Sequence, residues 1–184
     1  MPELQVAYRS IPSRFGDVVL AWHEENGEPK IVTISLPSRG DAVDESADEA
    51  HPPMEIDLLC DQIKRYLDGE AIEFPTSRLD PNTCTPFQWQ VLLAERTIPR
   101  GRVCSYRQLA TIIQNPKAAR AVGSALARNP FPIIIPCHRT VRSDGSLGGF
   151  GGGLPMKRAL LEMEGVVFDA SGRVEPEFFW PEAE

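Results

Sequence analysis

The first third of the chain alternates apolar and polar residues in the way that half-buried β-strands require. Three such segments lie at residues 4–9, 17–22 and 30–36. Gly16 and the Glu-Asn-Gly-Glu stretch at residues 25–28 supply turns between them, so the pattern predicts a small antiparallel sheet. The stretch 37–53 that follows is acidic and aperiodic and contains three prolines, which indicates a solvated loop.

From residue 54 onward the apolar pattern becomes that of a helix. Five apolar residues recur at spacings that place them on one helical face: Ile56, Leu59, Cys60, Ile63 and Leu67. Gly69 ends this helix, and a linker rich in turn-forming residues follows at 74–86. We therefore place a domain boundary near residue 84, between an N-terminal α/β lobe (1–83) and a C-terminal domain (84–184).

The C-terminal domain is predicted to be mostly helical, which makes the whole chain an α+β protein. An apolar helix is expected over residues 86–96. Ser105 and Gln108 have the spacing of a capping box and begin a second helix, which should end at residue 113. A tight turn leads into a third helix, with Pro116 in its first turn, that ends near residue 127. Two short helices joined so closely form a helix-turn-helix.

The second helix of this motif has two distinct faces. The face expected to pack inward carries Ala119, Val122 and Leu126. The opposite face carries a basic and polar stripe of Lys117, Arg120, Ser124 and Arg128. Small residues separate the two faces, namely Ala118, Ala121, Gly123 and Ala125. Because a helix that reads the major groove usually carries long polar side chains, this bare helix suits a minor groove and an inserted arginine. A helix packed tightly against another helix would show a similar set of small residues.

The distribution of charge allows a nucleic-acid partner although the net charge is −7. Residues 86–165 carry 11 basic and 4 acidic side chains, a net charge of +7, while the net charge is −10 over residues 1–85 and −4 over 166–184. Screening confines each charge to roughly 8 Å, so the basic segment can bind phosphates despite a distant acidic lobe. A merely solvated basic face remains an alternative. No apolar run reaches membrane-spanning length and no signal peptide is evident, so we expect no membrane partner and a cytoplasmic protein, or a nuclear one in a eukaryote.

Four cysteines, Cys60, Cys84, Cys104 and Cys137, form no C-x-x-C pair and match no zinc spacing. They are expected to be free thiols and to hold no metal, and each alone is most simply a buried apolar residue. Cys137 differs because an apolar segment at 131–136, suited to a buried strand or extended chain, delivers it beside His138 and Arg139. Such neighbours predict a lowered thiol pKa and a nucleophile.

A glycine-dense segment at 145–153 follows, and a last helix is expected over residues 155–164. Glycines let the backbone approach a ligand closely. The segment lacks a phosphate-loop or dinucleotide-binding pattern, so no nucleotide cofactor, and no other cofactor, is expected.

Taken together, these motifs resemble in order and spacing the O6-alkylguanine-DNA alkyltransferases. The resemblance covers about residues 84–166. It rests on Pro86-Phe87-Gln88, Ile98-Pro99-x-Gly101, Ser105-Tyr106, Ala118-Ala119-Arg120-Ala121-Val122-Gly123, Asn129-Pro130, Pro136-Cys137-His138-Arg139 and Glu164-Gly165.

The resemblance implies a monomer that binds double-stranded DNA containing O6-alkylguanine and repairs it directly. The alkyl group would pass once and irreversibly from O6 of guanine, and also from O4 of thymine, to Cys137. Arg120 would replace the flipped guanine in the stack. His138, acting through a water and oriented by Glu164, would take the thiol proton.

Further roles also follow from the resemblance alone. Tyr106 would help rotate the nucleotide and protonate guanine N3, and Asn129 would brace the turn that holds the nucleophile. The residues implied to contact DNA are Tyr106, Lys117, Ala119, Arg120, Gly123, Ser124 and Arg128. The residues implied to form the substrate pocket are Leu126, Thr140, Phe150, Gly151, Gly152 and Lys157.

Two pocket positions depart from the family pattern, since Thr140 stands where Val is usual and Phe150 where many members have Tyr. We expect a somewhat roomier pocket as a result. Three other functions are weighed against alkyl transfer. A non-catalytic lesion sensor would replace the nucleophile, typically by Trp, whereas Cys137 is present. A thiol hydrolase could use Cys137, His138 and Glu164, and a plain transcription factor could use the helix-turn-helix. The basic helix-turn-helix disfavours the hydrolase, and the cysteine motif disfavours the transcription factor.

Overall fold

The computed structural model describes residues 5–37 and 52–181 of the 184-residue chain. The chain divides into two compact units. The first comprises the chain up to Thr83 together with the short segment Pro130–Ile134, and the second comprises Cys84–Asn129 and the chain from Ile135 onward. Of the acidic loop predicted at 37–53, residues 38–51 lie outside the described residues.

The first unit is built on a three-stranded antiparallel sheet in the order β1-β2-β3. Its strands are β1 (Ala7–Ile11), β2 (Val18–Glu25) and β3 (Glu28–Ser35). Asn26 and Gly27 have φ of 53° and 80°, the positive values that a two-residue hairpin of type I′ requires between β2 and β3. The predicted sheet is confirmed, with strand ends shifted by a few residues.

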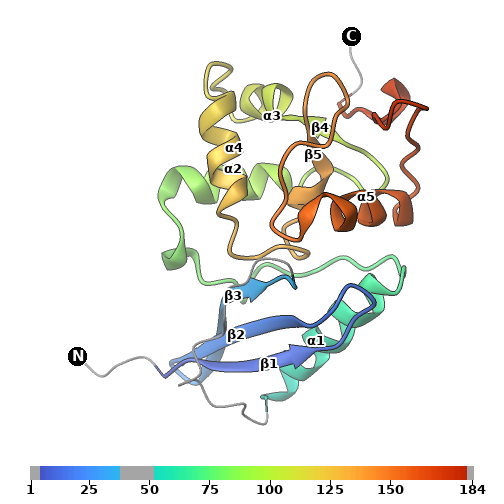
Figure 1. The fold of residues 1–184 in the computed structure, drawn as a ribbon. Coiled ribbons are helices and arrows are strands. Elements are labelled where there is room, and N and C mark those ends of the chain that lie inside the picture. The colour runs from blue at the N-terminus through green and yellow to red at the C-terminus, as the bar shows by residue number, and fades with distance from the viewer. Residues whose placement is uncertain (1–4, 38–51, 182–184) are drawn as a thin grey trace. The chain divides into compact units, whose positions relative to one another are not determined.

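One helix, α1 (Met54–Leu67), packs beside strand β1 of this sheet (Figure 1). All five residues of the predicted apolar stripe are buried, including Cys60, and Tyr66 joins them. The ring of Tyr66 meets Phe74 edge-on, with centroids 5.6 Å apart. The predicted helix and the core position of Cys60 are therefore confirmed. A short 3-10 turn, η1 (Pro81–Thr83), lies at the end of the first stretch of this unit.

The second unit is mostly helical, as predicted. Its helices are α2 (Pro86–Glu95), α3 (Tyr106–Ile112), α4 (Ala119–Ala127) and α5 (Gly153–Met163). A short parallel pair joins β4 (Cys104–Ser105) to β5 (Thr140–Val141), and the 3-10 turns η2 (Cys137–Arg139) and η3 (Pro176–Phe178) complete the unit. Helices α3 and α4 pack on each other and on α2, so the predicted helix-turn-helix is present (Figure 1).

The capping box that begins α3 is formed as predicted. The Ser105 hydroxyl accepts from the Gln108 N–H at 3.1 Å, and the Gln108 side-chain oxygen accepts from the Ser105 N–H at 2.8 Å. Helix α4 begins at Ala119, so Pro116 precedes it, and the prediction that this proline lies in the first turn was wrong. Helix α5 begins at Gly153, earlier than predicted.

The apolar segment at 131–136 is buried but is not the strand that was considered. Turns occupy its middle, and Ile133 has a φ of 75°. The reason is that Pro130, Pro132 and Pro136 lack the N–H groups that a sheet ladder needs. Helix α2, which was expected to be apolar, buries the acidic Glu95 and leaves the apolar Leu93 42% exposed.

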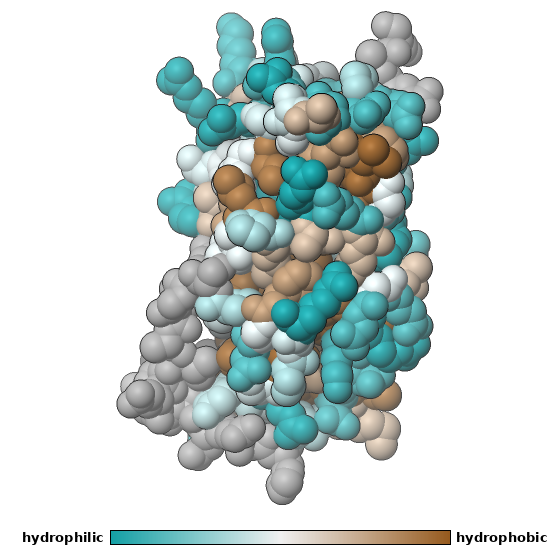
Figure 2. Space-filling view, turned by 45° about the vertical axis from the view of Figure 1, so that its right-hand side comes forward, coloured by the Kyte–Doolittle hydropathy of each residue, from teal (hydrophilic) through white to brown (hydrophobic). Residues whose placement is uncertain are grey.

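Apolar side chains reach the surface only in patches among hydrophilic ones on the face seen in Figure 2. In the second unit, one cluster of buried residues lies beneath α5: Val103, Val141, Leu161, Val166 and Val174. Across residues 5–37 and 52–181, none of the helices is both long and apolar enough to cross a membrane.

Candidate active site

Cys137 lies in the wall of a cavity of about 360 Å³ within the second unit. Helices α3 and α4, the turn η2 and the glycine-dense segment supply the walls. The lining residues are Tyr106, Gly123, Leu126, Ala127, Cys137, Gly149, Phe150 and Gly151. Cys137 is only 9% exposed, so a reacting group would have to enter the cavity to reach the sulfur.

Asn129 holds the turn that presents this thiol. It is 2% exposed and lies just beyond the end of α4, where its side-chain NH2 donates to the Ile135 carbonyl at 3.2 Å. The Asn129 side chain also hydrogen-bonds to Cys137. The Cys137 N–H donates to the Ile135 carbonyl at 2.8 Å, which closes the tight turn into η2. Asn129 therefore contacts both ends of the turn that carries Cys137, and the role predicted for it stays a prediction.

His138 forms a buried pair with Glu164 next to the thiol. The two side chains are fully buried, and His138 Nε2 lies 3.2 Å from Glu164 Oε1. Arg139 grips the same carboxylate with two nitrogens, at 2.9 Å and 2.8 Å, and donates to the Ile98 carbonyl at 2.7 Å. The carboxylate at the end of α5 therefore fixes both residues that follow Cys137 in the sequence.

The electrostatics of this group keep the imidazole neutral. Burial lowers the pKa of His138, and the opposing attraction of Glu164 offsets only part of this effect. Burial alone would raise the pKa of Glu164, but its contacts with His138 and Arg139 bring that pKa well below its usual value. A neutral imidazole beside a fixed carboxylate is a base that can accept a proton.

The thiol itself rests protonated, which corrects the prediction of a lowered pKa. Burial raises the pKa of Cys137 to about 11, although the hydrogen bond from Asn129 opposes this rise. The two basic neighbours that suggested the opposite do not act on the sulfur in that way, because His138 is neutral and Arg139 is engaged by Glu164. The nucleophile must therefore be formed during the reaction.

Tyr106, the first residue of α3, fits a slot between two glycines. A methyl group placed on Gly123 would lie 3.7 Å from the tyrosine ring, and one on Gly148 would lie 2.8 Å from its hydroxyl. The Gly149 N–H hydrogen-bonds to the phenol oxygen, which leaves the phenol hydrogen for another acceptor. Burial raises the pKa of Tyr106, so this group is a proton donor.

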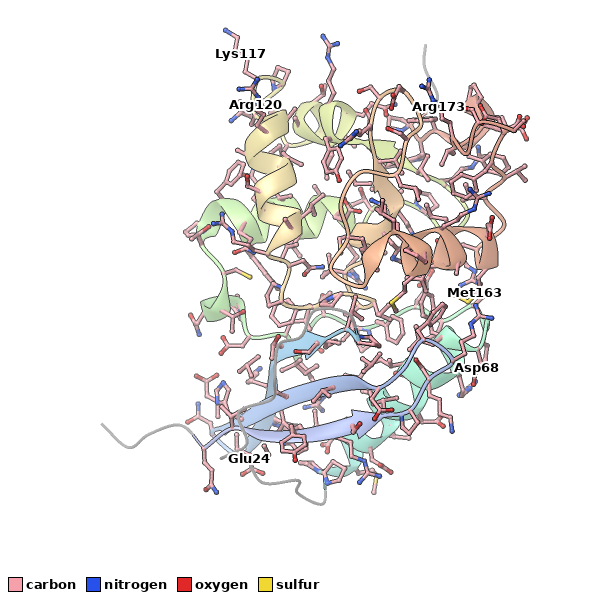
Figure 3. The ribbon with its side chains drawn as sticks, viewed as in Figure 1. Glu24, Asp68, Lys117, Arg120, Met163 and Arg173 are labelled. Atoms are coloured by element: carbon pink, nitrogen blue, oxygen red, sulfur yellow. The ribbon has the colours of Figure 1, made fainter. Side chains whose placement is uncertain are left out.

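The predicted basic stripe is exposed along α4 and the turn before it. Lys117, Arg120, Ser124 and Arg128 are all exposed, while Val122 and Leu126 are buried. Lys117 and Arg120 project from the N-terminal end of α4 (Figure 3). Ala119 is only half-buried, and Ala125, expected between the two faces, is buried instead. Gln88 of α2 donates to the Ala125 and Arg128 carbonyls and so anchors the other end of the helix.

The predicted pocket residues fall into two groups. Leu126, Phe150 and Gly151 line the cavity, and the Phe150 ring meets the His138 ring edge-on with centroids 6.2 Å apart. The other three, Thr140, Gly152 and Lys157, are buried but do not line it. Glu95, whose carboxylate accepts a hydrogen bond from the Thr140 hydroxyl, was not predicted from the sequence.

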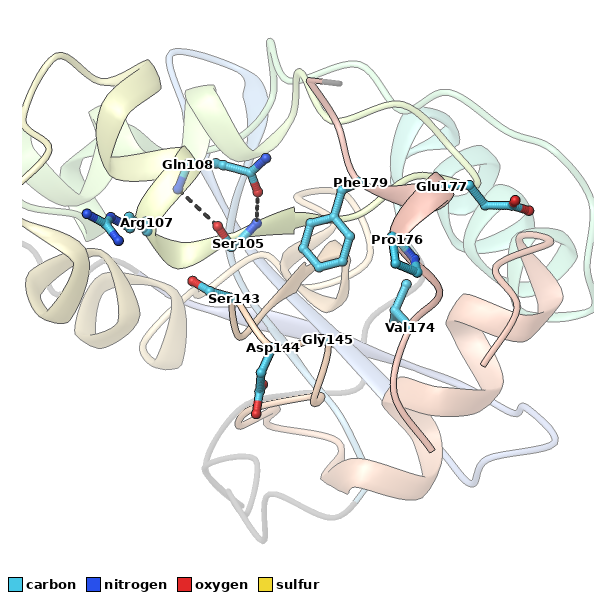
Figure 4. A pocket seen from close by; sticks show the side chains of 10 residues that line it. All are labelled: Ser105, Arg107, Gln108, Ser143, Asp144, Gly145, Val174, Pro176, Glu177 and Phe179. Atoms are coloured by element: carbon cyan, nitrogen blue, oxygen red, sulfur yellow. Dashed lines mark hydrogen bonds between the residues drawn. The ribbon is translucent and has the colours of Figure 1, made fainter. Parts of the chain in front are cut away.

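A larger cavity, of about 690 Å³, lies elsewhere in the second unit (Figure 4). Its lining residues are Ser105, Arg107, Gln108, Ser143, Asp144, Gly145, Val174, Pro176, Glu177 and Phe179. The polar groups of Ser105 and Gln108 already satisfy each other in the capping box (Figure 4). The smaller cavity remains the candidate active site, because it contains the thiol.

All four cysteines are thiols outside any disulfide, and three of them are buried while Cys84 is half-buried. Within the part of the chain that the structure describes, no group of three or more His, Cys, Asp or Glu residues could hold a metal ion. The candidate site is thus a thiol, an imidazole and a phenol around one cavity, adjoining an exposed basic helix. This combination defines a protein that does covalent chemistry on a nucleic acid.

Comparison with known proteins identifies that class further. Residues 86–166 match the family described as 6-O-methylguanine DNA methyltransferase, DNA binding domain. A methylated-DNA–protein-cysteine methyltransferase of Methanothermobacter thermautotrophicus is 39% identical over 150 residues, which are 82% of this chain and 80% of that protein. One of Mycobacterium tuberculosis is 40% identical over 86% of this chain and 92% of that protein. The crystal structure of Mycobacterium tuberculosis OGT in complex with DNA covers 86% of this chain and 92% of that chain, with 36% identity and a TM-score of 0.71.

The chain therefore belongs to the methylated-DNA–protein-cysteine methyltransferases. The likeness extends over both units, beyond the half of the chain that carried the sequence motifs. The α+β fold and the family that the motifs indicated are both confirmed.

Proposed function

We propose that Cys137 is the residue that takes the alkyl group, and that the guanine reaches it by rotating out of the duplex into the cavity. As a member of its family the protein repairs alkylated DNA by transferring the alkyl group to one of its own cysteines. Cys137 is chosen because its side chain lines a cavity of about 360 Å³. That volume lies within the range of about 300–1,000 Å³ that ligand pockets occupy.

His138 is the base that forms the nucleophile. Its Nε2 faces Glu164, so its other ring nitrogen would take the thiol proton through a water molecule. The thiolate sulfur then attacks the alkyl carbon in line with the bond to guanine O6. One bond forms between sulfur and carbon as the bond between carbon and oxygen breaks, and its electron pair leaves with the guanine. A thiolate generated only in this step is consistent with a resting thiol pKa of about 11.

Tyr106 supplies the proton that the departing guanine needs. Its phenol lines the same cavity as the thiol and is protonated at rest, because burial raises its pKa. Donation to guanine N3 neutralises the leaving group. The thiol proton taken up by His138 replaces the one that Tyr106 gives to guanine. The protein has then exchanged one proton, which leaves on the guanine, for the alkyl group of a thioether on Cys137. A thioether is a poor leaving group, and each molecule therefore reacts once without any cofactor.

Helix α4 brings the base to the thiol. Its exposed stripe places Arg120 and Lys117 where phosphates and the minor groove can be met, and its small residues let the helix lie close to DNA (Figure 3). Arg120 fills the gap that the rotated guanine leaves in the stack, at a cost of unstacking of roughly a few kcal/mol. Gly123 lies on α4 and also lines the cavity, so the helix that meets DNA borders the reactive pocket.

Two rival functions are disfavoured by the same residues. A non-catalytic sensor needs no nucleophile, whereas Cys137 here lines the same cavity as the phenol of Tyr106. A thiol hydrolase has no need of the exposed basic helix α4 that borders the cavity of the thiol.

The experiment compares Arg120→Ala with Lys117→Ala on two substrates. On a duplex with one O6-methylguanine, Arg120→Ala should react at least about 100-fold more slowly, because no side chain fills the stack. On the free base O6-benzylguanine it should react like the unaltered protein, since nothing has to be extruded. Lys117→Ala removes an exposed charge from the same stripe and should weaken duplex binding with little change in the rate at saturation. Equal losses on both substrates for Arg120→Ala would contradict its role in extruding the base. Any alkyl transfer to Cys137→Ser would contradict the assignment of Cys137 as the acceptor.

A further inference from the structure

A buried carboxylic acid lies behind the reactive site and has no part in the chemistry described so far. Glu95, the last residue of α2, is 0% exposed. Its Oε2 accepts from the Thr140 hydroxyl at 2.5 Å, and its Oε1 has no hydrogen-bond partner among the described residues. Burying an ionisable group costs several kcal/mol unless charge or hydrogen bonds compensate for it. Such a residue is retained at a functional site more readily than in an ordinary core.

The compensating charge is on Lys157, which is likewise 0% exposed. Its ammonium donates to the Thr140 carbonyl at 2.6 Å and to the Gly149 carbonyl at 3.2 Å. Thr140 is thus held from both sides, its hydroxyl by Glu95 and its carbonyl by Lys157. Burial raises the pKa of Glu95 to about 7, against the contrary effects of Thr140 and Lys157. Burial lowers the pKa of Lys157 to about 8, and negative charge on Cys137 and on Glu95 opposes that fall.

The two carbonyls that Lys157 grips frame the active site. Thr140 directly follows η2, which carries Cys137, and Gly149 belongs to the glycine-dense segment and lines the cavity. A charged Lys157 therefore fastens the chain that holds the nucleophile to the chain that forms the pocket wall. Without its charge, the ammonium would become an amine with fewer donors and a weaker grip on both carbonyls.

We propose that Glu95 is a positioning residue for alkyl transfer: its carboxylate keeps Lys157 charged, and so keeps Thr140 and Gly149 fastened around the reactive thiol. The role rests on the proposed function of Cys137 as acceptor.

The sign of the effect depends on two opposing actions of the Glu95 charge. It holds Lys157 in its charged form, which favours the reaction, and it raises the pKa of Cys137, which disfavours the reaction. The proposal requires the first action to outweigh the second. The charged or titratable groups within electrostatic reach of Glu95 are Lys157 of α5, Arg139 and Cys137 of η2, Cys104 of β4 and Tyr106 of α3.

The test is the rate of benzyl transfer from free O6-benzylguanine to the intact protein and to Glu95→Gln between pH 6 and pH 9. At pH 6 Glu95 is largely protonated in the unaltered protein, so the two rates should be similar. Above pH 7 the carboxylate predominates in the unaltered protein and is missing from Glu95→Gln. The variant should therefore be slower by about fivefold at pH 8, because a pKa lower by about one unit would leave about a tenth of Lys157 charged instead of about half. A variant that is faster at pH 8, or slower by the same factor at every pH, would overturn the proposal.

Two further variants serve as a control and as a replacement for Glu95→Gln. Glu162→Gln makes the same chemical change on the exposed face of α5, where Glu162 pairs with Arg158, and should leave the profile unchanged. If Glu95→Gln fails to fold, the double change of Glu95→Leu with Thr140→Val removes both hydrogen-bonding partners together, which costs little stability. It also leaves Lys157 without its counter-charge, and should show the same loss above pH 7.

A readout independent of alkyl transfer separates this role from the proposed function. The titration of Lys157, followed by NMR of its Nζ, should move to lower pH in Glu95→Gln and stay in place in Glu162→Gln. An unmoved titration would overturn the role of Glu95 whatever the activity. Benzyl found on a residue other than Cys137 in the unaltered protein would instead contradict the proposed function.

Discussion

Replacing Gly148 by alanine should disable Tyr106 without altering any reacting group. Gly148 has a φ of 69°, and an added Cβ would lie 2.8 Å from the hydroxyl of Tyr106 and 3.1 Å from its ring carbon Cε2. The backbone strain costs about 1–2 kcal/mol. The contact is too short to persist, so either the tyrosine or the segment that carries Gly148 must move.

A movement of Tyr106 by about 1 Å is expected to slow transfer about 100-fold, since the proton donor would no longer meet guanine N3. The assay is a single-turnover rate on duplex DNA with one O6-methylguanine, together with the free energy of unfolding from urea denaturation. The thiol and the His138–Glu164 pair are untouched by the change, so the loss can be ascribed to the phenol.

Gly27→Ala is the matched control. Gly27, in the hairpin between β2 and β3, also has a positive φ, of 80°, but an added Cβ there would meet no atom within 4 Å. It should cost a similar amount of unfolding free energy, about 1–2 kcal/mol, by the same backbone strain, and leave the transfer rate within about twofold. If Gly148→Ala and Gly27→Ala react at the same rate, the slot between the two glycines does not position Tyr106.

Two further predictions concern charge at the site. Alkylation of Cys137 by iodoacetamide should be slow at pH 7 and accelerate about tenfold per pH unit up to pH 9, because burial raises its pKa to about 11; a rate that levels off below pH 7 would show a thiolate at rest. Glu164→Gln should lower the unfolding free energy by about 3–5 kcal/mol at pH 7, since it breaks a buried charge network. A carboxylate with a lowered pKa stabilises the fold above its unfolded pKa, near 4.5, and this gain is lost as the pH falls. The gap to the unaltered protein should therefore narrow below pH 4.5, and a gap that stayed constant down to pH 3 would contradict the role of this carboxylate.

The local features of the fold could be predicted because a few neighbouring residues determine them. The stripe of α1 needs only the helical period, and the capping box at Ser105 and Gln108 needs only a spacing of three. The segment at 131–136 was harder, because its composition suits a strand while its prolines forbid the ladder.

The site depended on contacts between residues far apart in the sequence. Glu164 lies 26 positions from His138, and only the family resemblance brought the two together. Glu95 could not have been found in the same way, because an acid at the end of an apolar helix is normally exposed and its partner Thr140 is 45 positions away. The pKa of Cys137 was predicted in the wrong direction, because sequence neighbours suggested positive charge whereas burial decides the pKa.

The most direct test of the account is to locate the transferred methyl group. The protein is incubated with an excess of duplex DNA carrying O6-methylguanine, and intact and peptide masses are then recorded. A single transfer to Cys137 predicts a gain of one methyl group per molecule, on the peptide containing Cys137, with none on Cys60, Cys84 or Cys104. Methyl on another cysteine, or repair of more than one lesion per molecule, would contradict it.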